Sequence, residues 1–215
     1  MPTYLRTQAD LERAITTLAR QDPRLREVLA TASMPTLRRR PPGFAGLAQI
    51  IVGQQLSTAS ATAIWNRLSQ AFDPFAPDAI RRATTTRLAK LGLSAAKIKA
   101  LKSIATELRA KRLDLDALAD LDADQAHAVL TALHGVGPWT ADVYLLFCLG
   151  HSDAWPAADI GIQEGIRLGL GLESRPTTKE TTDLADPWRP LRGAAAHLWW
   201  AYYRAARRPV RVKLQ

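Results

Sequence analysis

The sequence predicts an all-α protein. Apolar residues recur every three or four positions in most segments, and no segment alternates apolar and polar residues between hairpin turns. Residues typical of helix starts and stops separate these periodic segments. At 215 residues the chain can bury a substantial core, so we expect residues 1–215 to form a single domain of two helical lobes.

The amino-terminal half contains three expected helical regions. Apolar positions between 11 and 29 fit one helix or a pair interrupted near Pro23, and the basic segment 38–43 fits a connector. Residues 44–51 have helical spacing, and Ser57 is placed to cap the helix after them.

The carboxyl-terminal half continues this pattern. Gly92 ends one helix, Ser94 can cap the next, and a further helix follows Asp122. Residues 160–170 and 191–207 are the last expected helices.

The chain is strongly basic, and its charges are segregated. The formal net charge is +9 and the isoelectric point is near 10.2. Segment 81–112 contains ten lysines or arginines and one acid, Glu107, whereas five aspartates fall between positions 114 and 124. This pattern predicts a polarised surface and a polyanionic partner, nucleic acid before membrane.

Metal and disulfide chemistry are poorly supported. Cys148 is the only cysteine, which excludes an intrachain disulfide and a cysteine-ligated cluster, and its apolar surroundings predict a buried structural thiol. The four histidines lack metal-ligand spacing. We see no signal-peptide core and no apolar run long enough to span a bilayer, so we expect a soluble cytoplasmic protein.

Residues 133–142 (LHGVGPWTAD) are the most informative stretch. Gly135 and Gly137 allow a sharp turn and the close approach of a partner, and Pro138 suits the first turn of a helix. Free N–H groups at such a helix start attract anions such as phosphate. Because Asp159 follows in the segment 156–159 (PAAD), the spacing predicts a phosphate clamp beside a catalytic acid.

This arrangement resembles the helix-hairpin-helix DNA glycosylase superfamily. Within it, three motifs look like the 3-methyladenine glycosylase II branch: 51–57 (IVGQQLS), 137–142 (GPWTAD) and 188–192 (WRPLR). The likeness runs from about residue 44 to 203, with the hairpin motif at about 126–149. It implies two helical lobes that flank a DNA-binding cleft, a base excision repair function and double-stranded DNA with alkylated bases as partner.

The resemblance implies that Asp159 is the catalytic carboxylate. Cleavage of an N-glycosidic bond builds positive charge on the deoxyribose, which a fixed anion stabilises, and the carboxylate can also orient the attacking water. The alternative is that Asp159 caps the helix from 160, and the two roles can coexist. Asp142, near a helix start, and Asp153, in an expected loop, are rival carboxylates of lower rank.

Trp139 stands where bifunctional members of the superfamily carry a lysine. An indole forms no Schiff base, so we expect a monofunctional glycosylase that leaves an abasic site. Trp139 can instead stack on an electron-poor flipped base. The alternative is a packing role, which we expect for Trp65, Trp199 and Trp200.

Base flipping leaves a gap in the duplex, and a wedge should fill it. By its match to the family loop, Gln55 is the candidate, with Gln54 and Leu56 beside it. The alternative for Gln55 is an ordinary polar residue in a turn between helices.

The hairpin is expected to hold a DNA phosphate through N–H groups near Gly135, Gly137, Trp139 and Thr140. No cofactor is expected to be required. By resemblance, main-chain carbonyls of Thr131, Leu133 and Val136 are positioned for a structural Na⁺ or K⁺. Four basic side chains are further candidates for phosphate contacts: Lys97, Lys99, Lys102 and Arg192.

The chain also departs from the best-known branch. We expect the segment before residue 44 to be too short for an additional β-rich lobe. Val143, Ile160 and Leu191 stand where that branch has pocket aromatics. This leaves 7-methylguanine, ethenoadenine and hypoxanthine open as substrates beside 3-methyladenine. We expect a monomer. The alternatives to an alkylated-base glycosylase are a glycosylase for other damaged bases and a helix-hairpin-helix DNA-binding module without catalysis.

Overall fold

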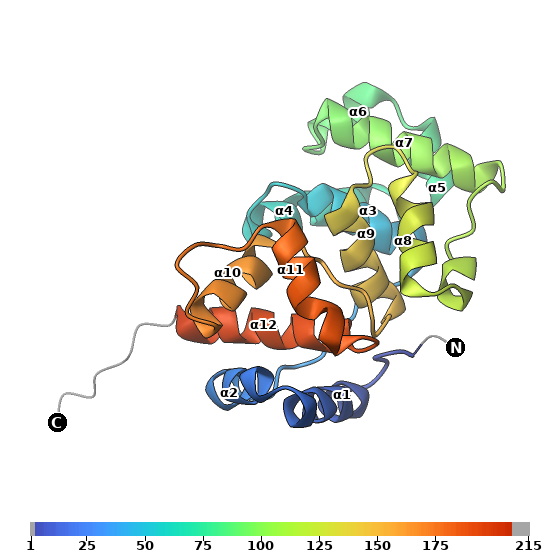
Figure 1. Cartoon of the computed structure of the whole chain (residues 1–215). Helices are drawn as coiled ribbons and strands as arrows, with labels where there is room; N and C mark the ends of the chain where they lie inside the picture. Colours follow the sequence, from blue (N-terminus) through green and yellow to red (C-terminus); the bar gives the residue numbers. More distant parts are fainter. Residues whose placement is uncertain (1–2, 208–215) are drawn as a thin grey trace. The chain divides into compact units, whose positions relative to one another are not determined.

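The computed structural model describes residues 3–207, and this part of the chain is built from helices (Figure 1). The described residues contain no strand, only an isolated bridge between Tyr4 and His151, so the all-α prediction is confirmed. None of the helices described is both long and apolar enough to cross a membrane.

The chain divides into two compact units. The first comprises Arg39–Leu149, and the second comprises Thr3–Arg38 together with residues 150–207. Each unit is helical, in agreement with the two expected lobes. The cleft between two lobes and the single-domain assignment stay predictions.

The first unit is built around α3 (Gly43–Gly53), an apolar helix of which seven residues are buried. The other elements of this unit are α4 (Thr58–Ala71), α5 (Pro77–Arg82), α6 (Thr85–Lys90), α7 (Ala95–Arg109), η1 (Ala117–Asp120), α8 (Ala123–Thr131), α9 (Pro138–Tyr144) and η2 (Leu145–Leu149). Helices α4, α7 and α9 all contact α3. A Cβ at Gly46 would lie 2.0 Å from the Pro41 carbonyl oxygen and 2.9 Å from Cys148 Sγ, so only glycine allows this close approach.

Cys148 lies in η2, a single π-helical turn, and its thiol is buried. Burial raises the pKa of this thiol to about 12. The thiolate is therefore strongly disfavoured, and the prediction of a buried structural cysteine is confirmed.

The second unit is organised by α12 (Arg192–Ala206), which packs against α2 (Pro23–Ala32) and α10 (Ile160–Gly169) (Figure 1). Its remaining elements are α1 (Gln8–Gln21), α11 (Thr178–Ala185) and η3 (Asp186–Trp188). Glycines bring α10 close to α12, because a Cβ at Gly165 would lie 2.9 Å from the Trp199 carbonyl oxygen. The core of the unit holds Trp188 and Trp199, whose ring centroids are 6.1 Å apart.

Side-chain caps fix the helix starts where the sequence predicts them. Ser57, Ser94 and Asp122 each accept a hydrogen bond from a backbone N–H in the first turn of α4, α7 and α8. The segment 11–29 is a pair of helices, since Asp22 caps α2 and Pro23 occupies its first position.

Asp22 also joins distant parts of the second unit. Its carboxylate forms an ion pair with Arg24 at 2.6 Å and accepts a hydrogen bond from Trp188 Nε1 at 2.9 Å. The Arg24 hydrogen bonds, together with that of Trp188, lower the pKa of Asp22 to about 2. A carboxyl with a lowered folded-state pKa stabilises the protein above its unfolded pKa, and the stabilisation is lost as pH falls through the folded value.

We therefore predict that Asp22→Asn changes the pH dependence of stability. Asparagine keeps a capping oxygen but loses the charge that faces Arg24, so the free energy of unfolding at pH 7 should fall by about 1–2 kcal/mol. Urea unfolding at pH 7 and at pH 2 measures this. The difference between native protein and variant should shrink towards pH 2, and an equal difference at both pH values would contradict the prediction.

Candidate functional site

The hairpin between α8 and α9 needs its first glycine. Gly135 has a φ of +83°, a left-handed conformation that favours glycine. A Cβ at this position would also lie 2.4 Å from the Cβ of Ala100 on α7. The turn is therefore held tightly against α7, and no larger residue fits.

The second glycine leaves the start of α9 open. Gly137 is the N-cap of α9, Pro138 occupies the first helical position, and no side chain caps the helix. A Cβ at Gly137 would have no atom of the described chain within 4 Å. The main chain at this helix start is therefore accessible to a partner, as a phosphate-binding turn requires.

The segment that follows α3 forms a tight turn. The Leu56 N–H donates to the Gly53 carbonyl at 3.3 Å, and Gln55 has a φ of +57°. A non-glycine residue is uncommon in this left-handed region. Gln55 and Leu56 are both exposed at the tip, so the turn presents the two residues expected to form the wedge.

The structure brings this turn and the hairpin together within the first unit. Gln54 Nε2 donates to the Gly135 carbonyl at 3.2 Å and to Thr140 Oγ1 at 2.8 Å. The neighbour of the candidate wedge thus touches two residues of the expected phosphate clamp. Trp139, between them in the clamp, is half-buried, while Thr140 is buried.

The side chain of Lys97 is bonded to the main chain at the end of α3. Its Nζ donates to the Val52 and Gln54 carbonyls, both at 2.8 Å, and burial lowers its pKa. The ammonium therefore satisfies carbonyls at the carboxyl end of α3. The two carbonyls use two of the three ammonium N–H groups, and the phosphate contact expected at Lys97 stays a prediction.

The remaining candidates for phosphate contacts differ in exposure. Lys99 is exposed, and Lys102 donates to the Arg81 carbonyl at 3.2 Å. Arg192 belongs to the second unit, and only 5% of its side chain is exposed, because two hydrogen bonds of 2.8 Å tie it to Asp153. Arg192 is therefore a structural residue, and its expected phosphate contact is wrong.

The main-chain oxygens proposed for a monovalent cation belong to a compact turn. The Leu133 carbonyl accepts a hydrogen bond from the Val136 N–H at 3.1 Å and, with two lone pairs, can still bind a cation. Neutral carbonyl oxygens such as those of Thr131, Leu133 and Val136 suit a hard cation of low charge. Over residues 3–207, no group of three or more His, Cys, Asp or Glu side chains could hold a metal.

Asp159 is fixed in the second unit by two hydrogen bonds to one oxygen. It is the N-cap of α10, and its Oδ1 accepts from the Ile162 N–H at 3.1 Å. The same Oδ1 accepts from Trp200 Nε1 at 2.8 Å. Capping and a second anchor therefore coexist, and the carboxylate is half-buried in a defined orientation.

Trp200 is the residue that the sequence reasoning missed. We expected it to serve packing, but its indole N–H donates to Asp159 from α12, 41 residues further along the chain. Gly161 leaves room for this pair, because a Cβ there would lie 3.1 Å from Asp159 Oδ1 and 3.3 Å from Trp200 Cδ1. Trp199, by contrast, is a core residue as expected.

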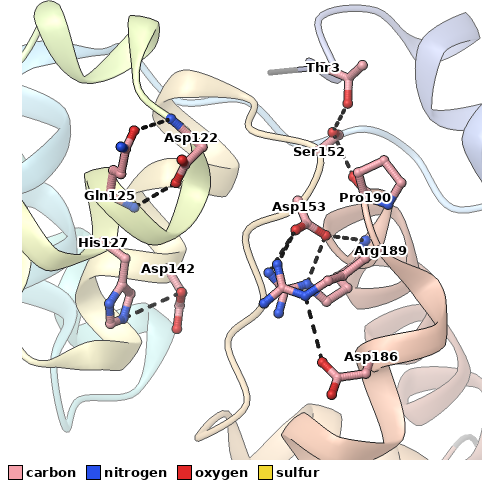
Figure 2. A network of polar contacts seen from close by, with 11 residues as sticks. Thr3, Asp122, Gln125, His127, Asp142, Ser152, Asp153, Asp186, Arg189 and Pro190 are labelled. Carbon is pink, nitrogen blue, oxygen red and sulfur yellow. Dashed lines mark hydrogen bonds and ion pairs between the residues drawn. The ribbon is translucent and has the colours of Figure 1, made fainter. Parts of the chain in front are cut away.

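The rival carboxylates have side-chain partners of their own (Figure 2). Asp153 bonds to Arg189 and Arg192, with N–O distances of 2.8 Å. Asp142 lies 3.7 Å from His127 Nε2 and 13% of its side chain is exposed. Asp153 is therefore held in ion pairs with two arginines, and Asp142 lies beside an imidazole whose pKa is lowered by burial. Asp159 keeps its first rank among the three carboxylates.

The three positions at which this chain lacks the expected pocket aromatics differ in exposure. Val143 is buried in α9, whereas Leu191 is half-buried before α12. Ile160, directly after Asp159, is 62% exposed.

Comparison with known proteins agrees with these features. A family model described as HhH-GPD superfamily base excision DNA repair protein matches residues 48–190. A DNA-3-methyladenine glycosylase of Bacillus subtilis is 27% identical over 173 residues, which are 74% of this chain and 57% of the relative. A probable bifunctional transcriptional activator/DNA repair enzyme of Mycobacterium tuberculosis is 33% identical over 83% of this chain and 37% of the relative. The chain thus spans only part of the length of these two relatives.

Other relatives are matched over more of their length. DNA-3-methyladenine glycosylase 1 of Schizosaccharomyces pombe is 32% identical over 78% of this chain and 76% of the relative. The solved structure of a 3-methyladenine DNA glycosylase of the same organism, in complex with abasic DNA, has a TM-score of 0.79 and 27% identity, and the match covers 87% of this chain and 95% of that one. A DNA-3-methyladenine glycosidase of Bacillus halodurans has a TM-score of 0.71 and 27% identity, covering 85% and 89%. This chain belongs to the HhH-GPD superfamily of base excision DNA repair proteins.

Proposed function

We propose that the protein is a monofunctional DNA glycosylase that removes alkylated bases from duplex DNA and leaves an abasic site. The observation that carries the proposal is the carboxylate of Asp159, which the α10 N-terminus and Trp200 hold in one orientation. The names of the relatives, which include 3-methyladenine glycosylases from bacteria and yeast, support the choice of substrate class.

Asp159 would act on the deoxyribose. As the N-glycosidic bond lengthens, positive charge develops on the sugar, and a preorganised anion stabilises that charge without having to reorient. The carboxylate would also orient or deprotonate the attacking water. An alkylated base such as 3-methyladenine already carries positive charge and leaves readily, so a strong general acid is unnecessary.

Trp139 would bind the flipped base. Its indole face attracts a cationic ring, which favours methylated purines over normal ones. Because an indole nitrogen forms no imine with the sugar, the enzyme should have no lyase activity.

The first unit would hold the DNA. The open start of α9 would bind a phosphate through N–H groups of Gly137, Trp139 and Thr140, with Gly135 shaping the turn. The exposed tip formed by Gln55 and Leu56 would fill the gap left by the flipped nucleotide. A Na⁺ or K⁺ on the hairpin carbonyls would reinforce the phosphate contact.

The monomeric state and the cytoplasmic location of the protein stay predictions.

The test of the proposal is base release by Asp159→Asn. Asparagine can cap α10 and accept from Trp200 like aspartate, so the fold should be kept while the negative charge is lost. We predict that the native protein frees 3-methyladenine from methylated duplex DNA and that the variant does so at least about 100-fold more slowly. Released bases are quantified by chromatography, and DNA binding by fluorescence anisotropy.

The same assay separates the alternatives. Full activity of Asp159→Asn would remove this residue from the mechanism. DNA binding without release from any damaged base would favour a module without catalysis, and release restricted to oxidised or mismatched bases would favour a different glycosylase. Strand nicking without added base or heat would contradict monofunctional chemistry.

Trp200→Phe tests the anchor of Asp159. Phenylalanine keeps an aromatic ring but lacks the N–H that donates to Oδ1, so we predict base release about five- to tenfold slower with unchanged DNA affinity. Trp65→Phe, the same change in the first unit, is the matched control and should release bases at the native rate. Equal loss in both variants would show a general effect of the substitution.

Trp139→Ala tests the base-binding role. Loss of the indole should slow release of cationic 3-methyladenine about tenfold, whereas Trp139→Phe should retain most of the rate because it still offers a π-face. Single-turnover rates on methylated DNA measure both effects. If alanine and phenylalanine variants were equally slow, stacking would not be the role of Trp139.

A further inference from the structure

The turn 53–56 is held by three side chains, Gln54, Lys97 and Thr140, which we call the brace. Lys97 ties the turn to α7, whereas the bond between Gln54 and Thr140 ties it to the hairpin. Lys97 Nζ holds the Gln54 carbonyl at 2.8 Å, and the Gln54 side chain reaches Thr140 Oγ1 at 2.8 Å. All three residues belong to the first unit.

Gln54 is fixed at both its main chain and its side chain. Its carbonyl accepts from a half-buried ammonium, and its Nε2 donates to the Gly135 carbonyl as well as to Thr140. The hydrogen bond from a charged donor is among the stronger ones. Rotation of the turn relative to the hairpin would break several of these bonds together.

The residue next to Gln54 has a demanding conformation. Gln55 lies at a φ of +57° on the exposed tip, and a side chain in this region persists only where the surroundings hold it. The hydrogen bonds at Gln54 immediately precede this position. The brace therefore fixes the direction in which the tip points.

The other end of the brace reaches the expected phosphate clamp. The Gly135 carbonyl and the Thr140 hydroxyl belong to the hairpin, whereas the clamp itself uses backbone N–H groups. Side-chain bonds thus connect the tip to the hairpin without consuming the groups that would hold the phosphate.

We propose that Gln54 is a positioning residue that couples phosphate binding at the hairpin to insertion of the Gln55 tip at a damaged site. The inference rests on the proposed function, since it takes the tip to be the wedge. The brace acts by limiting rotation of the turn, so that a hairpin seated on a phosphate directs Gln55 into the duplex.

Thr140→Val isolates this coupling. Valine has nearly the shape of threonine, keeps the backbone N–H and removes only the hydroxyl that accepts from Gln54. Thr140→Ser restores a hydroxyl and is the matched control. Gln54→Leu removes both side-chain bonds of the brace, and Gln55→Ala removes the tip side chain.

Binding to two duplexes gives the readout. One duplex carries a tetrahydrofuran abasic site opposite 2-aminopurine, whose fluorescence reports filling of the gap, and the other is undamaged. We expect Gln54→Leu to bind undamaged DNA like the native protein while its preference for the abasic duplex falls about fivefold. For Thr140→Val, the ratio of its affinities for the abasic and the undamaged duplex should fall by about the same factor. Thr140→Ser should keep the preference.

A double variant distinguishes coupling between Thr140 and the tip from a general loss of stability. If Thr140 acts through the tip, then adding Thr140→Val to Gln55→Ala should cause no further loss of preference. Additive losses, an equal fall in affinity for both duplexes, or a native protein without preference for the abasic site would overturn the inference. Base release is not needed for this test, so abasic preference without release would refute the proposed function alone.

Discussion

The candidate site in the second unit depends on one carboxylate oxygen that accepts two hydrogen bonds. The Ile162 N–H and the Trp200 indole both point at Asp159 Oδ1, one from the helix that Asp159 caps and one from α12. Since α12 also packs against α2 and α10, the orientation of the carboxylate is tied to the core of the second unit. A charge held in this way can stabilise a developing cation with little reorganisation.

In the first unit, by contrast, glycines at the hairpin lack side chains, so that backbone groups can approach a partner. Gly135 is required by the chain itself, because α7 leaves no space for a Cβ. Gly137 faces open space instead, so its lack of a side chain serves access from outside. The hairpin therefore combines a rigid side and an open side within three residues.

The sequence predicts interactions between residues that are close along the chain and misses those between residues that are far apart along it. The caps Ser57, Ser94, Asp122 and Asp159 are found from sequence because each bonds to a backbone N–H only three residues away. The short helices α5 and α11 are too brief to show a clear apolar period. The side-chain bonds of Trp200, Lys97 and Arg192 are not predicted because their partners lie 41, 43 and 39 residues away, and nothing in the neighbouring sequence marks those bonds.

The most direct test of the central claim compares binding of a cationic and a neutral sugar mimic. A duplex with a protonated pyrrolidine in place of the deoxyribose carries positive charge where the transition state does, whereas a tetrahydrofuran site of similar shape does not. If Asp159 stabilises that charge, the native protein should bind the pyrrolidine duplex about 100-fold more tightly, and Asp159→Asn should lose most of this difference. Equal affinity of the native protein for both duplexes, or a preference that survives in Asp159→Asn, would contradict the account.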